Sequence, residues 1–413
     1  MICTFVLLHK YILNKRRCQD ISCKNLCLPL FHIIMKKVRL TCFYIIRMDF
    51  RCCDILRLVW FCLPVSLFCT WGCVSGDMPD EPEEHETSSE DVPDGYLFFR
   101  DDSTGHLKYI AFMGKFTDPG FSLLDSAAVD MDLGLDCYHP EVSPDGKWVA
   151  FSTGYESSGG ASSLYVKRIG NSAPPQKLNV VNAAIPRWRV LPDGDTVIVY
   201  VDDTRVLPSR NTEEDSLIRI HFLQWTDRGT WIVPFKGGSF GESRKIADGT
   251  FNGGVSEDLT YMVSGSALLL GRHVVYGEGG GVEKEETSIW FDWEQVCNTS
   301  LSRDGTNRTL FLDMSGKQGV DFSGETYRPH QRILVVDESG TLVHSVPSPA
   351  GTAFNNTEWI GVDDYVIADL IETESFNSSI VLVNMRDSSI VDLVRGGKMG
   401  YPNLWVNPAY RQP

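Results

Sequence analysis

The chain has 413 residues, of which 43% are hydrophobic and 22% charged, a composition typical of a globular protein rather than a disordered one. Its 38 Lys and Arg residues face 54 Asp and Glu residues, which gives a net charge of −16. A general nucleic-acid-binding protein needs a basic surface, so this charge argues against that class of function.

The first 73 residues differ from the rest, because they hold 11 of the basic residues, 3 of the acidic ones and 10 of the 12 cysteines. Residues 1–47 contain short apolar runs broken by basic clusters and nothing that resembles a fold. We interpret them as an overextended or unstructured start, with Met48 as the expected first residue. These cysteines predict no disulfide framework, since most would be removed with the signal.

Residues 48–73 are predicted to form a signal segment. The run from Leu58 to Gly72 has 15 residues and no charge, which is short for a membrane span of about 20 residues and typical of a signal core. Its end, TWGC, resembles the cleavage box of bacterial lipoproteins, and the resemblance implies that Cys73 is lipidated. An ordinary cleaved signal and a retained membrane anchor are the alternatives.

Residues 74–94 follow with nine acidic residues and no basic one. Such a segment cannot bury enough apolar surface to fold. We expect a disordered acidic linker, which would hold the following domain away from a membrane.

From Tyr96 onward, short alternating strands are separated by turn residues, and one phrase recurs: an apolar strand, a Pro/Asp/Gly turn and a second β-rich run. Copies begin at His139, Ile185, Asn252, Asn298, Asn356 and, truncated, Pro402, at spacings of 46, 67, 46, 58 and 46 residues. Strand repeats of about 40–50 residues are typical of propeller blades. One apolar position is shared by the copies and is predicted to wedge between blades: Val142, Trp188, Val255, Leu301, Trp359 and Trp405.

The two ends of this region complement each other. The last copy has only a first strand, Leu404–Val406, whereas GYLFFRDD, HLKYIAFM and Phe121–Leu124 read as second, third and fourth strands without a first. Joining the ends removes exposed sheet edges. The sequence therefore predicts an all-β fold over residues 95–413, a six-bladed β-propeller closed by a composite N- and C-terminal blade.

The phrase SPDGKWVAF at Ser143–Phe151 resembles the TolB-type (WD-like) propeller repeat, which also occurs in the propeller domains of prolyl oligopeptidases. CNTSLSRDGTNRTLFLD, RILVVDESG and YPNLWV are similar to a paralogous family of Fibrobacter bacteria that is rich in predicted lipoproteins and has no established function. The resemblance covers residues 95–413. It implies a propeller in the cell envelope and no particular chemistry.

No motif predicts a catalytic centre, a cofactor or a metal. Gly237–Gly241 matches G-x-S-x-G, but that motif needs a strand-to-helix turn in an α/β sheet, so we interpret it as a glycine-rich loop. The histidines lack zinc-ligand spacing. The acidic pairs at 202–203 and 363–364 are interpreted as solvated turn residues rather than calcium ligands.

Cys137 and Cys297 are the thiols within the propeller region, in the first and fourth copies. Three steps around a six-fold ring place them on opposite sides of the channel. Because a disulfide needs Cα atoms within about 7 Å, both are predicted to be unpaired.

Polar residues at the starts of the inner strands are expected to converge on the propeller axis. The candidate channel residues form two levels: His139, Asn252, Asn298 and Asn356, and two positions later Glu141, Arg187 and Glu358. They are predicted either to bind a peptide terminus or a sugar, or to satisfy backbone groups and trapped water. A second candidate is an aromatic surface of Trp225, Trp231, Trp290 and Trp293, with packing between blades as the alternative.

The resulting hypothesis is a noncatalytic, lipid-anchored envelope propeller that binds a protein partner or cell-surface carbohydrate, at the outer membrane or the periplasmic face. One alternative is a glycoside hydrolase or lyase that uses Glu141 and Glu358, because such enzymes need paired carboxylates. The other is a structural envelope component.

Overall fold

The computed structural model describes residues 93–118, 120–154, 162–180, 182–202, 228–265, 269–278, 281–291, 296–313, 324, 326–362 and 364–410, which belong to one compact unit, Thr87–Pro413. Cys73, the predicted signal segment and residues 74–92 of the predicted linker lie outside these ranges. These ranges contain no long apolar helix of the kind that spans a membrane.

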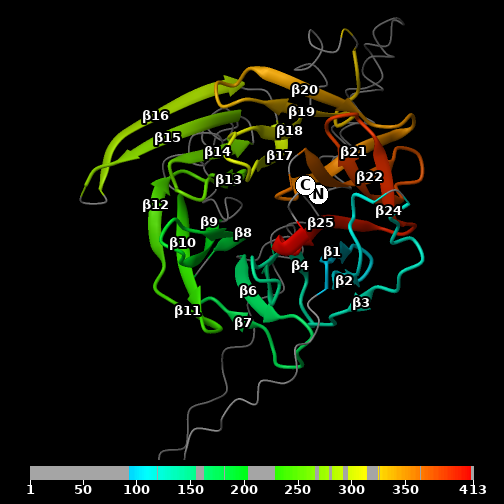
Figure 1. The fold of residues 1–413 in the computed structure, drawn as a ribbon, viewed down its shortest axis with the longest axis horizontal. Coiled ribbons are helices and arrows are strands. Elements are labelled where there is room, and N and C mark those ends of the chain that lie inside the picture. Colours follow the sequence, from blue (N-terminus) through cyan, green and yellow to red (C-terminus); the bar gives the residue numbers. More distant parts are fainter. Residues whose placement is uncertain are drawn as a thin grey trace, which may run out of the picture. The chain divides into compact units, whose positions relative to one another are not determined.

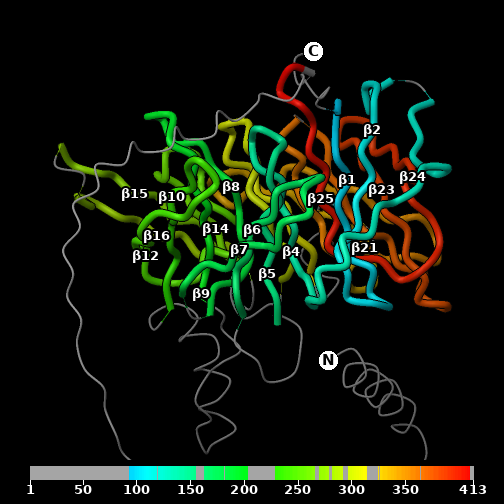
Figure 2. The backbone as a smooth tube through the Cα atoms, turned by 90° about the horizontal axis from the view of Figure 1, so that it is seen from below, coloured from blue at the N-terminus to red at the C-terminus, as the bar shows by residue number. Residues whose placement is uncertain are grey.

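Six antiparallel sheets surround a central channel, and the strands run from one face of the ring to the other (Figures 1 and 2). We number the sheets as blades in chain order, each from its inner to its outer strand. Blade 1 contains β4 (Cys137–Val142), β5 (Trp148–Thr153), β6 (Ser163–Arg168) and β7 (Gln176–Lys177). Blade 2 contains β8 (Ala183–Val190), β9 (Thr196–Asp202), β10 (Gly229–Lys236) and β12 (Arg244–Asp248), with β11 (Ser239–Phe240) also paired to β10.

Blade 3 contains β13 (Gly254–Val255), β14 (Tyr261–Gly265), β15 (Leu269–Tyr276) and β16 (Val282–Phe291). Blade 4 contains β17 (Val296–Leu301), β18 (Thr309–Asp313), β19 (Arg332–Val336) and β20 (Leu342–Pro347). Blade 5 contains β21 (Thr352–Trp359), β22 (Tyr365–Glu372), β23 (Ser378–Asn384) and β24 (Ile390–Arg395). Blade 6 combines β25 (Met399–Val406) with β1 (Gly95–Asp101), β2 (Leu107–Phe112) and β3 (Val129–Asp130), and a 3-10 turn (Pro408–Tyr410) follows. The predicted six-bladed all-β propeller is therefore confirmed.

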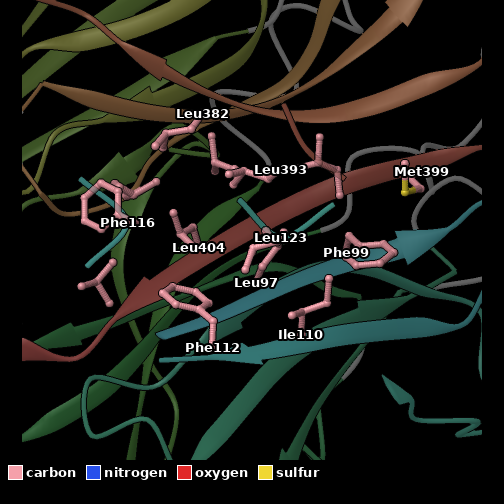
Figure 3. Close-up of a cluster of buried hydrophobic side chains, with 14 residues drawn as sticks. Leu97, Phe99, Ile110, Phe112, Phe116, Leu123, Leu382, Leu393, Met399 and Leu404 are labelled. Atoms are coloured by element: carbon pink, nitrogen blue, oxygen red, sulfur yellow. The ribbon is translucent and has the colours of Figure 1, made fainter. Parts of the chain in front are cut away.

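The composite blade closes the ring as predicted. β25 pairs antiparallel with β1, which sets Trp405 opposite Tyr96 and Asn403 opposite Phe98. A cluster of buried side chains lies between this blade and blade 5, with Leu404 and Leu97 beside Leu382 and Leu393 (Figure 3). Burial of apolar side chains is worth about 1.5–3 kcal/mol each, so this cluster stabilises the closed ring.

Two details of blade 6 differ from the prediction. Its outer strand is β3, because Val129 pairs with Tyr109, whereas Phe121 and Leu123 of the predicted strand belong to a loop that packs into the cluster of Figure 3. The wedge position of this blade is Leu404 and not Trp405.

The reason for the second difference is a one-residue offset in the last copy. The inner strand of blade 6 carries its irregularity at residues 401–402, as blade 1 does at residues 139–140, so Leu404 corresponds to Val142. Trp405 is still buried, at 4% exposure, and its ring lies against the turn of blade 1 at Gly146.

The turn between β4 and β5 follows the predicted Pro-Asp-Gly chemistry. Ser143 donates its hydroxyl to Asp145, and the amide of Gly146 donates to the carbonyl of Ser143 over 2.9 Å. Gly146 has a φ of +71°, a conformation that glycine adopts without steric cost.

Replacing Gly146 by alanine tests the contact that closes the ring. A Cβ there would lie 2.5 Å from the Trp405 ring, whereas one at Gly194, in the matching turn of blade 2 with a φ of +90°, would meet nothing within 4 Å. Both substitutions strain the backbone, but only Gly146→Ala overpacks a core, so we expect it to lower the free energy of unfolding by about 1–3 kcal/mol more than Gly194→Ala. Urea unfolding of both variants measures the difference, and equal losses would contradict the contact.

Candidate functional site

A β-bulge recurs in the inner strand of five of the six blades. In each, two residues of the inner strand face one residue of the second strand, at positions 139–140, 185–186, 298–299, 356–357 and 401–402. The first residue of each pair has a positive φ, between 43° and 53°. A bulge bends its strand, re-aims side chains and frees backbone groups from the ladder. Each of these five inner strands therefore bends at the equivalent position of its blade.

The bulges surround a cavity of about 290 Å³. Its lining includes all seven predicted channel residues: His139, Glu141, Arg187, Asn252, Asn298, Asn356 and Glu358. The structure therefore brings together the two levels that the repeat alignment proposed.

Sequence reasoning missed other lining residues, chiefly Tyr401, Asn403, Asp202, Thr299 and Cys297. Tyr401 takes the bulge position in blade 6, and its ring contacts His139, with centroids 4.7 Å apart. Starting the last copy at Tyr401 instead of Pro402 would have placed Tyr401 and Asn403 in the two levels. Ile185 likewise takes the bulge position of blade 2.

Two ion pairs cross the channel between opposite blades. Arg187 of blade 2 donates two hydrogen bonds of 2.8 Å to the carboxylate of Glu358 in blade 5. Glu141 of blade 1 pairs with Arg303, which follows the inner strand of blade 4. A two-point arginine–carboxylate contact fixes both position and orientation, so the Arg187–Glu358 pair links blades 2 and 5 across the channel.

Glu141 has a second cationic neighbour, Arg189, whose Nη1 lies 3.9 Å from its Oε1. Arg189 is 2% exposed and donates hydrogen bonds to the carbonyls of Val255 and Trp188. Burial, with the nearby positive charge of Arg187, lowers the pKa of Arg189 to about 10. The guanidinium still carries its charge at neutral pH, with Glu141 within ion-pair distance of it.

Side chains two positions after the bulge also join neighbouring blades. Glu141 accepts a hydrogen bond from the backbone N–H of Trp188, over 2.8 Å. Ser300 accepts one from Trp359, and Asn403 accepts one from Val142, each over 3.2 Å. This level of the channel therefore has a structural role between blades 1 and 2, 4 and 5, and 6 and 1.

The amide side chains at the bulge level have different hydrogen-bond partners. Asn252 is held by the backbone of Gly265, to which it donates over 3.0 Å and from which it accepts over 3.0 Å. Asn298 donates over 3.3 Å to Asn355, and Asn355 donates over 3.0 Å to the buried carboxylate of Asp369. Asn252 is thus a structural residue, whereas Asn298 links the cavity to a buried carboxylate.

Asp369 is an unusual acid at the junction of blades 5 and 6. Burial raises its pKa to about 7, and the charge of Asp102 adds to the increase, while the amides of Asn355 and Asn356 oppose it. Its side chain is 1% exposed, so the protonated form is favoured by the folded protein.

The predicted aromatic surface is only partly described, since Trp225 and Trp293 lie outside the described residues. Trp231 is half-buried and stacks on Tyr200, with centroids 6.4 Å apart. Trp290 is half-buried against Gly271 and Gly340 of blades 3 and 4. Both side chains make packing contacts, which agrees with the alternative of packing between blades.

The remaining motifs have structural explanations. Residues 237–238 form the turn between β10 and β11, in which Lys236 pairs with Ser239, so the G-x-S-x-G match is a hairpin. Asp202 accepts a hydrogen bond from the amide of Gly229, and Asp364 pairs with Arg308 and Arg386. Within the described ranges, no group of three potential metal ligands occurs. Cys137 and Cys297 are both free thiols, as predicted.

Comparison with known proteins gives distant structural similarities and no match to a family. No family model and no curated protein matches the chain. Among solved structures, TolB from Acinetobacter baumannii is similar over 75% of this chain and 66% of its own, with 11% identity and a TM-score of 0.39. A chain of a nidogen/laminin complex is similar over 76% and 99%, with 10% identity and a TM-score of 0.44. An oligogalacturonate lyase in complex with manganese is similar over 73% and 72%, with 13% identity and a TM-score of 0.35. The chain is a six-bladed β-propeller whose fold neighbours include TolB.

Proposed function

We propose that this propeller is a noncatalytic binding domain of the cell envelope, which holds a protein partner or a cell-surface carbohydrate in its channel cavity. One observation carries the proposal: the cavity is lined by amides and rings at the bulge level, while both candidate catalytic carboxylates are paired with arginines. Binding sites of this kind combine a concave shape with a few convergent polar groups.

The bulge level offers suitable chemistry for a sugar or a peptide terminus. The amides of Asn298 and Asn356 provide both donors and acceptors, which match hydroxyl groups and peptide bonds. The rings of Tyr401 and His139 meet edge to face, at an interplanar angle of 71°, and provide an aromatic contact that suits a sugar ring or an apolar side chain. No cofactor is part of this proposal.

The hydrolase or lyase alternative would require the same carboxylates to act as acid and base. Glu358 accepts both hydrogen bonds of Arg187, and Glu141 binds Arg303 and the amide of Trp188. Each carboxylate would have to leave these partners before it could transfer a proton. The hydrogen bonds of Glu141 between blades also fit the third possibility, a structural envelope component.

The proposed location rests on the sequence of residues 48–94. A lipid on Cys73 and the acidic linker would hold the propeller near the outer membrane or the periplasmic face. The similarity to the Fibrobacter family, in which predicted lipoproteins are frequent, supports this proposal. Metabolic labelling with a fatty-acid analogue would show a lipid that is lost in Cys73→Ala.

Binding can be tested with the full chain on a glycan array and by capture from its native envelope. Asn356→Ala and Tyr401→Ala are expected to weaken binding at least about tenfold, because each removes a contact worth more than about 1.4 kcal/mol. Asn377→Ala is the matched control, since Asn377 is exposed on the β22–β23 connection, away from the cavity lining. Affinity that is equal in all three variants would contradict the cavity as the site, and release of new sugar ends from the array would favour the enzyme.

A further inference from the structure

The cavity wall contains a thiol beside an imidazole. Cys297, immediately before the bulge in blade 4, lines the cavity, and its Sγ lies 3.0 Å from Nε2 of His330. Cys297 belongs to β17, whereas His330 lies in the connection just before β19 of the same blade. A thiol within hydrogen-bond reach of an imidazole is the arrangement that makes cysteine a nucleophile at neutral pH.

The backbone that carries the imidazole is held by two hydrogen bonds. The backbone amide of His330 donates to the carbonyl of Asp313 over 3.1 Å, and the amide of Phe354 donates to the carbonyl of His330 over 2.8 Å. Burial lowers the pKa of His330, against the opposing effects of Asp313 and of a hydrogen bond with the Phe354 backbone. The ring is therefore neutral at pH 7 and able to accept a proton.

The geometry points to Cys297 as an acyl-accepting nucleophile, with His330 as its general base, for the acyl group of a small ester or thioester. This inference goes beyond ligand binding and does not depend on which ligand the cavity holds.

The step balances without a metal or an oxidant. The Cys297 sulfur attacks the carbonyl carbon of the ester while its proton moves to Nε2 of His330. The carbon–oxygen bond to the leaving alcohol then breaks, and the alkoxide takes the proton from His330. The products are an S-acyl cysteine and a free alcohol.

Cys137 provides an internal control. Burial raises the pKa of both thiols to about 12, so simple ionisation would make them equally inert. Cys137 is wholly buried in an apolar cluster and donates to the carbonyl of Leu135. Only Cys297 combines the cavity with an imidazole.

The test treats the full chain with p-nitrophenyl acetate and measures acetylation of each cysteine by peptide mass spectrometry. We expect acetyl transfer to Cys297 and none to Cys137. His330→Gln is expected to slow acetylation of Cys297 by at least about 100-fold, the usual effect of losing a general base. Asn377→Ala should leave the rate unchanged.

The pH dependence of the unsubstituted chain gives a readout that no folding defect affects. With His330 as the base, acetylation of Cys297 should level off above the lowered pKa of the imidazole, below its ordinary 6.5. With an unassisted thiolate, the rate would climb about tenfold per pH unit toward pH 12. A continuing climb, or equal acetylation of Cys137 and Cys297, would overturn the inference.

Discussion

Replacement of Glu141 by glutamine is expected to lower the free energy of unfolding by about 3–5 kcal/mol, because it removes one partner of a buried charge cluster. The side chain of Glu141 is 5% exposed and faces Arg303 and Arg189. Glutamine can still accept the hydrogen bond of the Trp188 amide. The loss of stability therefore measures the effect of the missing charge, not of the hydrogen bond between blades 1 and 2. Urea unfolding followed by circular dichroism measures it.

Glu358→Gln is the matched control for this experiment. The side chain of Glu358 is 24% exposed, and its partner Arg187 keeps a hydrogen bond to the carbonyl of Asn252. The expected loss is therefore smaller, about 1.5–3 kcal/mol, the range for a hydrogen bond to a charged group. Losses below 1 kcal/mol for Glu141→Gln, or a larger loss for Glu358→Gln, would show that the cluster does not stabilise the ring.

Asp369→Asn should stabilise the propeller at pH 8 and leave its stability at pH 4 nearly unchanged. The folded carboxyl keeps its proton up to about pH 7, whereas the model value of an unfolded Asp is 3.8. Between these values the folded state binds more protons, so the free energy of unfolding falls as the pH rises. A difference of about three units corresponds to about 4 kcal/mol, and asparagine avoids this cost because it carries no charge.

Asp304→Asn should show the opposite dependence on pH. Hydrogen bonds from Thr306 and Arg308 outweigh burial and lower the pKa of Asp304 to about 2. Its contribution is present above the unfolded pKa and is lost as the pH falls from about 4 to 2. We expect this variant to lose stability at pH 8. Urea midpoints at both pH values give the comparison, and similar profiles for the two variants would refute the assigned protonation of Asp369.

The architecture was predictable because its signals are local and repeated. The turn at residues 144–146, the alternating strands after it and the incomplete last copy each depend on neighbouring residues, and six copies average out the errors. The same copies were sufficient to place His139, Glu141 and Arg187 in one channel. Where a copy departed from the pattern, as with Tyr401 in place of an amide or histidine, the alignment slipped by one residue.

The chemistry of the site was less predictable because it depends on contacts across the ring. Nothing near Glu141 in the sequence indicates that Arg303 pairs with it from the opposite blade. Likewise, Cys297 and His330 are separated by 33 residues and meet through the packing of a single blade. The predicted outer strand at residues 121–124 failed because an apolar run specifies burial but not the ladder it joins.

The position of β1 inside its sheet has a mechanical consequence. β1 pairs with β25 on one side and β2 on the other, so a pull on its N-terminal end acts along two ladders at once. Such a load shears all of their hydrogen bonds together instead of peeling them apart one by one. A domain held by its N-terminal side in a moving fluid would therefore resist extraction of its first strand, and the joint that closes the ring would also bear the tension.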